Sequence, residues 1–307
     1  MTWLLGSGTA LVGAPTIVRL AGDHGLQWLV LAVAVLPLLV PVLLVLSIAQ
    51  LVLHRHRLAL LTAALLAVNA VWLAPLFVAN RVRTGQALSV LTANLRFGRA
   101  DAAALVTLVK AHRVDVLAVE ELTPEEVRRL RTAGLERELP YAELLPFREA
   151  DGSGLWSRFP LVGLPAFHAR FQSPAAQITL PGGDVVVHVL HPFPTNLGGA
   201  GEYRRDYATL TAQVRRLDPG LPTVLAGDFN ATADQSALRD LMGSQFRDAS
   251  ELAGSGFQRT WTPRLGWPAL LHLDHVLVNA RIDARSTRVL RLAGSDHWAL
   301  LARLVLT

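Results

Sequence analysis

The sequence predicts an N-terminal membrane region followed by a layered α/β or α+β domain. Three observations support this fold class. Long stretches without charge are confined to residues 1–83, short apolar runs typical of strands begin after Arg83, and amphipathic helical patterns lie between several of those runs. The domain would occupy residues 84–307, a length within the usual range of a single domain.

The composition also indicates a membrane region. Of the 307 residues, 51% are hydrophobic, and the mean hydropathy is +0.36, which is high for a wholly soluble protein. The chain contains no cysteine, so disulfides and thiolate metal sites are excluded. Any metal ion would be held by oxygen and nitrogen atoms.

Two apolar segments predict transmembrane helices. Residues 25–53 carry no ionisable side chain and are long enough to cross a hydrocarbon core of about 30 Å. Pro37 and Pro41 fall inside this segment, and neighbouring membrane helices can compensate for such residues. After a polar break at residues 54–57, residues 58–79 form the second uncharged segment. The pair predicts a helical hairpin.

Residues 3–20 are a third candidate, weakened by several glycines and a proline. A signal peptide is the competing interpretation, but the segment lacks a basic start and a small-residue cleavage site. Two or three membrane helices are therefore expected. Two arginines in the loop between residues 53 and 58 oppose three on the other side, so charge alone leaves the orientation balanced.

In the domain, apolar runs alternate with helical patterns in a mixed order. The helical patterns have polar and apolar residues at helical spacing. They cover residues 101–112, 124–132 and 202–217. The predicted strands are short runs rich in Val and Leu. They cover residues 88–95, 114–121, 184–191, 222–229, 273–279 and 299–306.

Several of these strands end in residues that can bind a metal ion or transfer a proton. Any one of these residues taken alone can be explained by structure, because Asn and Asp side chains often form hydrogen bonds to their own backbone in loops. In the stretch LAGDFNATAD, strand geometry places Asp228 and Asn230 on one side and directs Phe229 into the core. The polar residues at strand ends are Asn94, Glu120, Glu121, His191, Asp228, Asn230, Asp274, Asp296 and His297.

The order of these motifs resembles the endonuclease/exonuclease/phosphatase superfamily, whose fold is shared by DNase I, abasic-site endonucleases, sphingomyelinases and inositol polyphosphate 5-phosphatases. The similarity runs from Leu88 to Thr307 and is carried by VDVLAVEEL, GLWSRFP, GDFN, LDHVLV and SDHW. One such motif alone is weak evidence, whereas the ordered series is strong. The resemblance implies a four-layer α/β/β/α sandwich of the DNase I type.

The resemblance also implies roles for individual residues. Glu121 matches the family's metal carboxylate, with Asn94 beside it and Asp296 close to the metal or its water. Oxygen ligands and the absence of cysteine favour Mg²⁺, with Mn²⁺ as a plausible substitute. Asp228 matches the residue that orients or deprotonates the attacking water, and Asn230 the one that hydrogen-bonds a phosphate oxygen.

The family's histidines have counterparts as well. His297 matches the histidine on the scissile phosphate, Asp274 would hold its imidazole, and His191 matches the second histidine. His188, three residues before His191, is expected on the other face of its strand and is interpreted as structural. Arg158 in the SRFP turn would contact phosphate, with a structural ion pair as the alternative.

Two features bear on the substrate class: a departure from the family's motifs and the distribution of net charge. Arg96 stands where abasic-site endonucleases have a second carboxylate, which argues against that branch. Four of the five net positive charges belong to residues 1–83, so the domain lacks the basic excess of proteins that grip long nucleic acids. Apolar N-terminal helices joined to such a domain resemble the membrane-anchored bacterial branch that includes the teicoplanin-resistance protein VanJ. That similarity implies a multi-pass protein of the cell membrane with an extracytoplasmic catalytic domain.

These observations predict a metal-dependent phosphoesterase that is anchored in the lipid bilayer and acts on a phosphorylated small-molecule or lipid substrate. A phosphomonoester, a phosphodiester and a pyrophosphate all remain open as the bond cleaved. An extracytoplasmic nuclease with the same catalytic residues is one alternative, although a nucleic-acid partner is not expected. A non-catalytic membrane-anchored binding platform is the other. The sequence does not indicate an oligomeric state.

Overall fold

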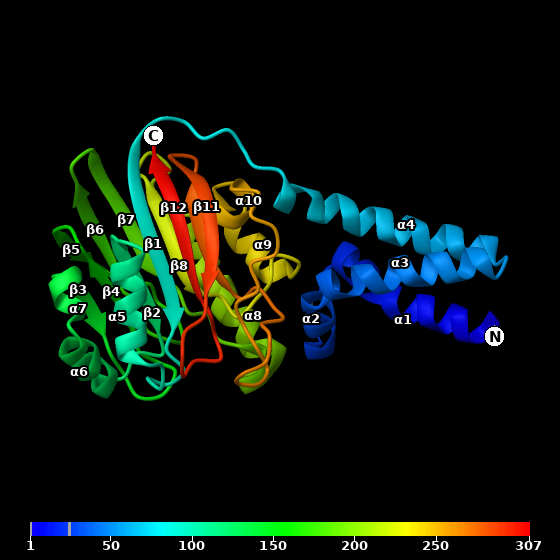
Figure 1. The fold of residues 1–307 in the computed structure, drawn as a ribbon, viewed down its shortest axis with the longest axis horizontal. Coiled ribbons are helices and arrows are strands. Elements are labelled where there is room, and N and C mark those ends of the chain that lie inside the picture. The colour runs from blue at the N-terminus through cyan, green and yellow to red at the C-terminus, as the bar shows by residue number, and fades with distance from the viewer. Residues whose placement is uncertain (1, 24–25) are drawn as a thin grey trace.

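Two six-stranded sheets packed face to face form the centre of the molecule (Figure 1). The structure is a computed structural model that describes residues 2–23 and 26–307. Both sheets are mixed, with one parallel pair each and antiparallel neighbours otherwise. The α+β sandwich predicted from the sequence is confirmed.

The first sheet has the strand order β11-β12-β1-β2-β4-β3. Its parallel pair, β1 (Gln86–Asn94) and β2 (Val116–Glu120), ends in register, with Asn94 beside Glu120. Both strands are buried from end to end except at the start of β1, as expected for the centre of a covered sheet. The other strands are β3 (Tyr141–Leu145), β4 (Ser153–Ser157), β11 (Ile282–Leu290) and β12 (Ala299–Leu306).

The second sheet has the order β5-β6-β7-β8-β10-β9. Its parallel pair is β7 (Gly183–Val189) and β8 (Thr223–Asp228), and β10 (Asp274–Asn279) lies antiparallel to β8. The register pairs Asp274, the first residue of β10, with Asp228, the last residue of β8. The other strands are β5 (Leu161–Leu164), β6 (Ala175–Leu180) and β9 (Phe246–Asp248).

Three buried apolar clusters account for the layers. One fills the space between the sheets and another lies between the first sheet and α5 and α6. The third joins the second sheet to α8 and α9, so helices cover both outer faces. The helices of the domain are α5 (Ala102–Ala111), α6 (Pro124–Ala133), α7 (Leu135–Glu138), α8 (Thr195–Val214), α9 (Ser236–Met242) and α10 (Ala249–Leu252).

The N-terminal helices project from the sandwich as an elongated bundle (Figure 1). The prediction of a single helix over residues 25–53 is wrong, because α2 and α3 meet at Val35 with a bend of 67°. Pro37 lies in the first turn of α3, where its missing N–H is not needed, so the new helix begins there. The helices are α1 (Thr2–Ala21), α2 (Gln27–Ala34), α3 (Leu36–Val52), α4 (His56–Leu73) and the 3-10 turn η1 (Ala74–Phe77).

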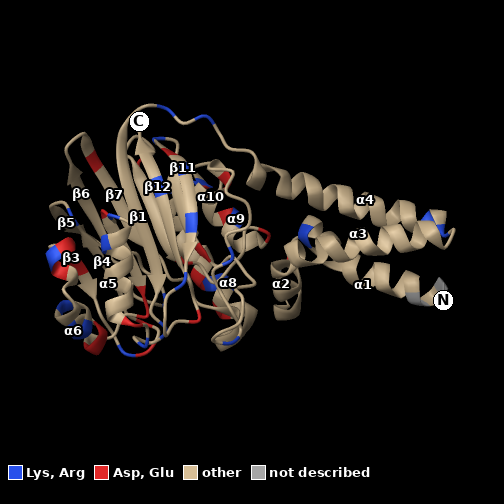
Figure 2. Ribbon diagram, in the orientation of Figure 1, with Lys and Arg blue, Asp and Glu red and all other residues tan. Residues whose placement is uncertain are grey.

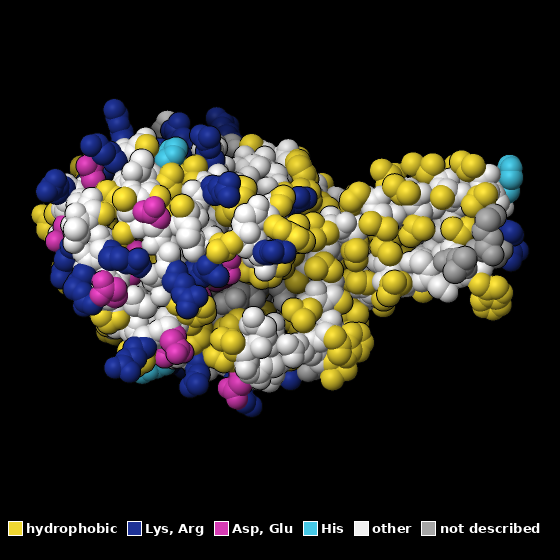
Figure 3. Space-filling view, turned by 60° about the horizontal axis from the view of Figure 1, so that its bottom comes forward, with side chains coloured by type: hydrophobic (Ala, Val, Ile, Leu, Met, Phe, Trp, Pro, Cys, Tyr) yellow, Lys and Arg dark blue, Asp and Glu magenta, His cyan; other side chains and the backbone are white. Residues whose placement is uncertain are grey.

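One helical stretch, His56–Phe77, is long and apolar enough to cross a membrane, and a second qualifies if α2 and α3 are counted as one bent span. Figure 2 shows that Lys and Arg on the bundle are confined to the ends of its helices. Figure 3 shows apolar side chains over much of the visible face of the bundle, in contrast to the charged face of the sandwich. These features are compatible with a membrane anchor.

Candidate active site

The site lies where the parallel strands of the two sheets end. Asn94 is the last residue of β1 and Glu121 follows β2, while Asp228 is the last residue of β8. Glu121 has a φ of 57°, a left-handed conformation that turns its carboxylate out of the strand direction. The facing sheets thus bring three polar strand ends together.

A chain of buried polar side chains forms the centre of the site. His297 Nδ1 donates a hydrogen bond to Asp274 Oδ2 at 2.8 Å, and His297 Nε2 lies 3.5 Å from Asp228 Oδ2. His191 Nε2 lies 3.8 Å from the same Asp228 oxygen. Asp228 is therefore flanked by two histidines, and one of them is oriented by a carboxylate.

The two histidines differ in charge for a physical reason. Burial lowers the pKa of His191 to about 4, because the attraction of Asp228 is too weak to offset it. Burial also disfavours the charge on His297, but Asp274 and Asp228 attract the cation and raise its pKa to about 10. Near neutral pH the site therefore holds a neutral His191 and an imidazolium at His297.

Asn94 connects the ends of the two sheets. Its Nδ2 donates to Glu121 Oε1 at 3.0 Å and to Asp228 Oδ2 at 2.9 Å. Its Oδ1 accepts from the backbone N–H of Arg96, and Phe97 N–H donates to Glu121 Oε2 at 2.6 Å. The side-chain oxygen of Asn94, which a metal ion would require, is thus turned to the backbone.

The residues of the site fit a hard divalent cation. Burial raises the pKa of Glu121, and also that of Asp228, where Asp274 adds to the effect. Within the described part of the chain, Asp274 Oδ1 and Glu120 Oε2 are buried without a hydrogen-bond partner. A crowded set of buried carboxylate oxygens is the type of donor set that binds Mg²⁺ or Mn²⁺. Glu120 itself is fully buried between the sheets, where Thr92 on the adjacent strand donates a hydrogen bond to it.

Asn230 and Asp296 lie at the rim of this network. Asn230 adopts a left-handed φ of 49°, and its backbone N–H donates to Asp228 Oδ1 at 2.9 Å. Its Nδ2 donates to the carbonyl of Pro192 at 3.1 Å, close to His191. Asp296 lies 3.6 Å from Arg96 and is about one-third exposed, so it faces the rim rather than the buried carboxylates.

Arg158 is not brought to the site. The residue before it, Ser157, pairs with Val116 at the start of β2, whereas Ser153 pairs with Glu120 at the end that carries the candidate site. Arg158 instead forms an ion pair with Asp115 at 3.3 Å. The prediction that Arg158 contacts phosphate is therefore wrong, and the structural ion pair given as the alternative is what the structure shows. The reason is that β4 runs antiparallel to β2, so the last residue of β4 lies at the end of the sheet opposite the site.

Two further residues support the site. The Ser295 hydroxyl donates to the carbonyl of Asn94 at 2.8 Å and accepts from the backbone N–H of His297, which joins the last loop to β1. Tyr207 on α8 donates to the carbonyl of Phe229 at 2.5 Å. The SDHW motif pointed to Ser295. Nothing in the sequence distinguished Tyr207 from an ordinary core residue of an amphipathic helix.

Comparison with known proteins agrees with this geometry. The model of the Endonuclease/Exonuclease/phosphatase family matches residues 91–297. No curated protein matches the chain. Among solved structures, an endonuclease/exonuclease/phosphatase family protein from Bacteroides thetaiotaomicron is similar with a TM-score of 0.58 at 15% identity, covering 73% of this chain and all of the other.

Two structures with more specific descriptions share the fold. A mannosyl-6-phosphatase from Bacteroides thetaiotaomicron has a TM-score of 0.58 at 16% identity, with 71% of this chain and 100% of the other covered. D. rerio TDP2 in complex with a single-strand DNA product has a TM-score of 0.57 at 16% identity, with 71% and 99% covered. At such identities the likeness concerns the fold alone.

Proposed function

The chain belongs to the endonuclease/exonuclease/phosphatase family, and from this premise we propose that it is a metal-dependent phosphoesterase anchored in a membrane. The observation that carries the proposal is the buried arrangement of Asp274, His297, Asp228 and His191 where the strand ends of the two sheets meet. Hydrolysis of a phosphoester requires a base for water, a donor for the leaving oxygen and a means of offsetting phosphate charge. The site contains a candidate for each role.

The proton-transfer roles follow from the charges. Asp228 would accept the proton of the attacking water, and the neutral His191 is a second acceptor. His297 carries the proton that the leaving oxygen needs, and Asp274 fixes which ring nitrogen faces Asp228. Asn230 can donate to a phosphate oxygen by giving up its bond to Pro192, without adding charge.

A divalent cation would supply charge neutralisation for the phosphate when it is bound. Glu121 is the residue best suited to hold it, because it is only half-buried and both of its oxygens lie at the end of β2, where Asn94 and Phe97 donate to them. Asn94 would contribute if its amide turned the oxygen away from Arg96. Asp296, at the rim of the site, would bind the ion directly or through a water molecule.

We propose a small or lipid-linked phosphate as the substrate. One solved relative in fold is a phosphatase and another holds a single-strand DNA product, so the fold accommodates both substrate classes. The near-neutral charge of residues 84–307 favours the former. A substrate held in the same bilayer would meet the site at a raised effective concentration. The cell-membrane location, with the domain outside the cytoplasm, belongs to the same proposal.

Phosphate release by the detergent-purified protein tests this function. Undecaprenyl pyrophosphate, a phospholipid, a nucleotide and duplex DNA are each incubated with Mg²⁺ or with EDTA. We expect Mg²⁺-dependent release from a lipid substrate that is lost in Asp228→Ala. Asp184→Ala is the matched control, because Asp184 lies near the opposite end of β7 and is exposed.

Each result has a separate meaning. Cleavage of DNA without release from lipid would identify a nuclease. Turnover that survives in Asp228→Ala would contradict the assigned chemistry. Absence of turnover on every substrate, together with no binding of Mg²⁺ by calorimetry, would favour the non-catalytic platform.

A further inference from the structure

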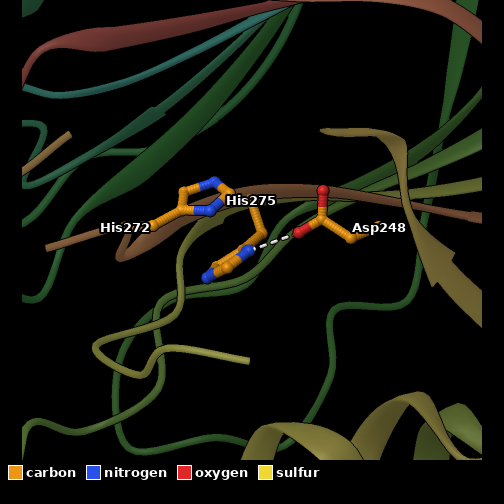
Figure 4. A group of neighbouring side chains, drawn as sticks. All are labelled: Asp248, His272 and His275. Carbon is orange, nitrogen blue, oxygen red and sulfur yellow. Dashed lines mark hydrogen bonds and ion pairs between the residues drawn. The ribbon is translucent and has the colours of Figure 1, made fainter. Parts of the chain in front are cut away.

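A second polar cluster lies beside the active-site turn and is built from Asp248, His272 and His275 (Figure 4). Asp248 is the last residue of β9, and His275 is the second residue of β10. His275 directly follows Asp274, so strand alternation directs the two side chains to opposite faces of the sheet. Asp274 faces the catalytic histidine, and His275 faces the layer between the sheet and α8.

Both ring nitrogens of His275 are engaged. Nδ1 lies 2.5 Å from Asp248 Oδ2, and Nε2 lies 2.9 Å from the carbonyl oxygen of Ala231. A carbonyl oxygen can only accept a hydrogen bond, and so can an ionised carboxylate. Asp248 is ionised, because contact with His275 outweighs the effect of burial and lowers its pKa to about 2. Each nitrogen must therefore carry a hydrogen, which makes the ring an imidazolium.

The surroundings support this charge. Burial opposes a cation at His275, but the hydrogen bond to Asp248 and its attraction raise the pKa of His275 above the usual value. His272 stacks on the ring with centroids 4.2 Å apart, and burial lowers the pKa of His272 to about 3, so it adds no second positive charge. Asp274 is the other acidic group nearby, and it is bonded to His297.

The hydrogen bond to Ala231 acts on the turn that carries the catalytic groups. Asp228 ends β8, Asn230 follows in a left-handed conformation, and Ala231 comes next, fully buried. Backbone atoms on either side of Ala231 are held by other elements: Tyr207 binds the Phe229 carbonyl, and Gln235 Oε1 accepts from Thr232 N–H. The bond from His275 joins this turn to β10.

We propose that His275 is a positioning residue: held by Asp248 at Nδ1, it donates the Nε2 hydrogen to the Ala231 carbonyl and so fixes Asp228 and Asn230. The proposal rests on the phosphoesterase function above and deepens it. Consecutive residues of one strand would then set both halves of the site, because Asp274 orients His297 and His275 orients the opposing turn. The cluster of Asp248, His272 and His275 therefore binds a proton and not a metal ion, because neither nitrogen of His275 has a free lone pair.

Two amide variants separate the contacts of His275. In His275→Gln the side-chain nitrogen reaches the position of Nε2 and can still donate to Ala231. In His275→Asn it reaches only the position of Nδ1 and keeps the contact with Asp248. We expect His275→Gln to retain kcat within about threefold and His275→Asn to lose roughly 10- to 100-fold, as loss of one charge-assisted hydrogen bond implies. The KM should change little in either variant.

Thermal unfolding of both variants controls for folding. Equal losses of kcat in the two variants, or full activity in His275→Asn, would overturn the positioning role. Nitrogen-15 spectra of the wild-type ring give a readout that needs no turnover. Two protonated nitrogens are expected at pH 7, whereas a single neutral tautomer, or binding of one Zn²⁺ to the cluster, would overturn the imidazolium.

A wild-type protein inactive on every phosphoester would overturn the proposed function alone. The positioning role would then be decided by the side-chain amide resonance of Asn230. This resonance should shift from its wild-type position in His275→Asn and stay in place in His275→Gln. An unchanged resonance in both would contradict the proposal.

Discussion

His191 and His297 lie on either side of Asp228, yet only His297 has a second carboxylate within hydrogen-bonding distance. Asp274 binds its Nδ1 at 2.8 Å, while Nδ1 of His191 contacts no carboxylate among the described residues. Since both rings are buried, this single contact decides which of them is charged. The assignment of acid and base therefore depends mainly on one residue, Asp274.

Replacing Asp274 by Asn should lower kcat by about 10²- to 10⁴-fold, the range of a lost acid–base contribution. The amide preserves shape but removes the charge that stabilises the imidazolium, and it can present an N–H where the ring needs an acceptor. Steady-state kinetics on the best substrate of the panel measures the change, with KM expected within about threefold because binding contacts stay in place. An Asp274→Asn protein with wild-type kcat and an unchanged unfolding temperature would show that His297 needs no partner.

His188 predicts a pH dependence of stability. Its ring stacks on Phe167 and is buried, and neither nitrogen has a partner among the described residues, so burial lowers its pKa to about 4. Above pH 6.5 the residue is neutral in both the folded and the unfolded state. Between pH 6.5 and 4 only the unfolded chain takes up the proton, so the folded state loses stability as the pH falls.

The loss should reach about 3 kcal/mol at pH 4, from the size of this pKa shift. His188→Leu, with a side chain of similar size, removes the titration and should unfold at a higher temperature than the wild type at pH 4.5. The two proteins should differ much less at pH 7.5. His191 and His272, whose pKa values are also lowered, titrate similarly in both proteins, so they cancel in the difference. Parallel curves over the whole range would refute the assignment.

At the level of elements, the sequence predicts the strands that lie at the centre of each sheet. β1, β2, β7, β8, β10 and β12 all fall within a few residues of the predicted runs. These strands are buried on both faces and therefore appear as continuous apolar runs. The polar residues at the ends of these strands could be predicted as well, because a polar residue that follows a continuous apolar run is easy to recognise in the sequence.

The other elements carry weaker signals. β3 and β5 are only five and four residues long and are partly exposed, so neither forms a long apolar run in the sequence. The bend at Val35 could not be predicted, because prolines in apolar helices are compatible with a straight span. Arg158 was misplaced because a motif records neighbours along the chain and not the direction of the strand. The pair of Asp248 and His275 joins strands far apart in the sequence, which no local pattern reveals.

Gly227 shows how closely β7 and β8 approach beside the site. A Cβ at this position would lie 1.9 Å from the carbonyl oxygen of Leu190, whose N–H bonds to Ala226. Gly227→Ala should therefore destabilise the fold by about 2–4 kcal/mol and displace Asp228. Gly201→Ala is the control, because its Cβ would meet no atom within 4 Å and its helix should gain about 1 kcal/mol. Urea unfolding measures both, and equal stabilities would contradict the close approach.

On the scale of the whole molecule, the turn that carries Asp228 and Asn230 continues directly into the surface that holds the N-terminal helices. Asp234 pairs with Arg19 of α1 at 2.8 Å, and Ser236 N–H donates to Asp23 at 3.0 Å. Val30 of α2 packs into the apolar cluster beneath α8. Only a few residues separate these contacts from Asn230, so the helices and the active site are parts of one packed unit.

The exposed apolar surface of the bundle leads to the last prediction. Leu60, Leu61 and Val71 of α4 are 74%, 52% and 70% exposed, and Figure 3 shows apolar side chains over much of the visible face of the N-terminal bundle. A continuous apolar surface of this kind is costly in water and marks contact with a membrane or a partner. We expect the full chain to remain with the membrane fraction after an alkaline wash and to require detergent for extraction.

A matched pair of substitutions tests which surface is responsible. Leu61→Arg and Val71→Arg together place charge on α4 at a cost of a few kcal/mol in a bilayer, so the protein should shift toward the wash supernatant or be lost to degradation. Val162→Arg adds charge to a residue that is 70% exposed on β5 and should leave the distribution unchanged. If the wild-type chain were instead released by the wash, its apolar bundle would be covered by protein. A bilayer-held substrate would then lose its main support, while the chemistry assigned to Asp228 and His297 would stand.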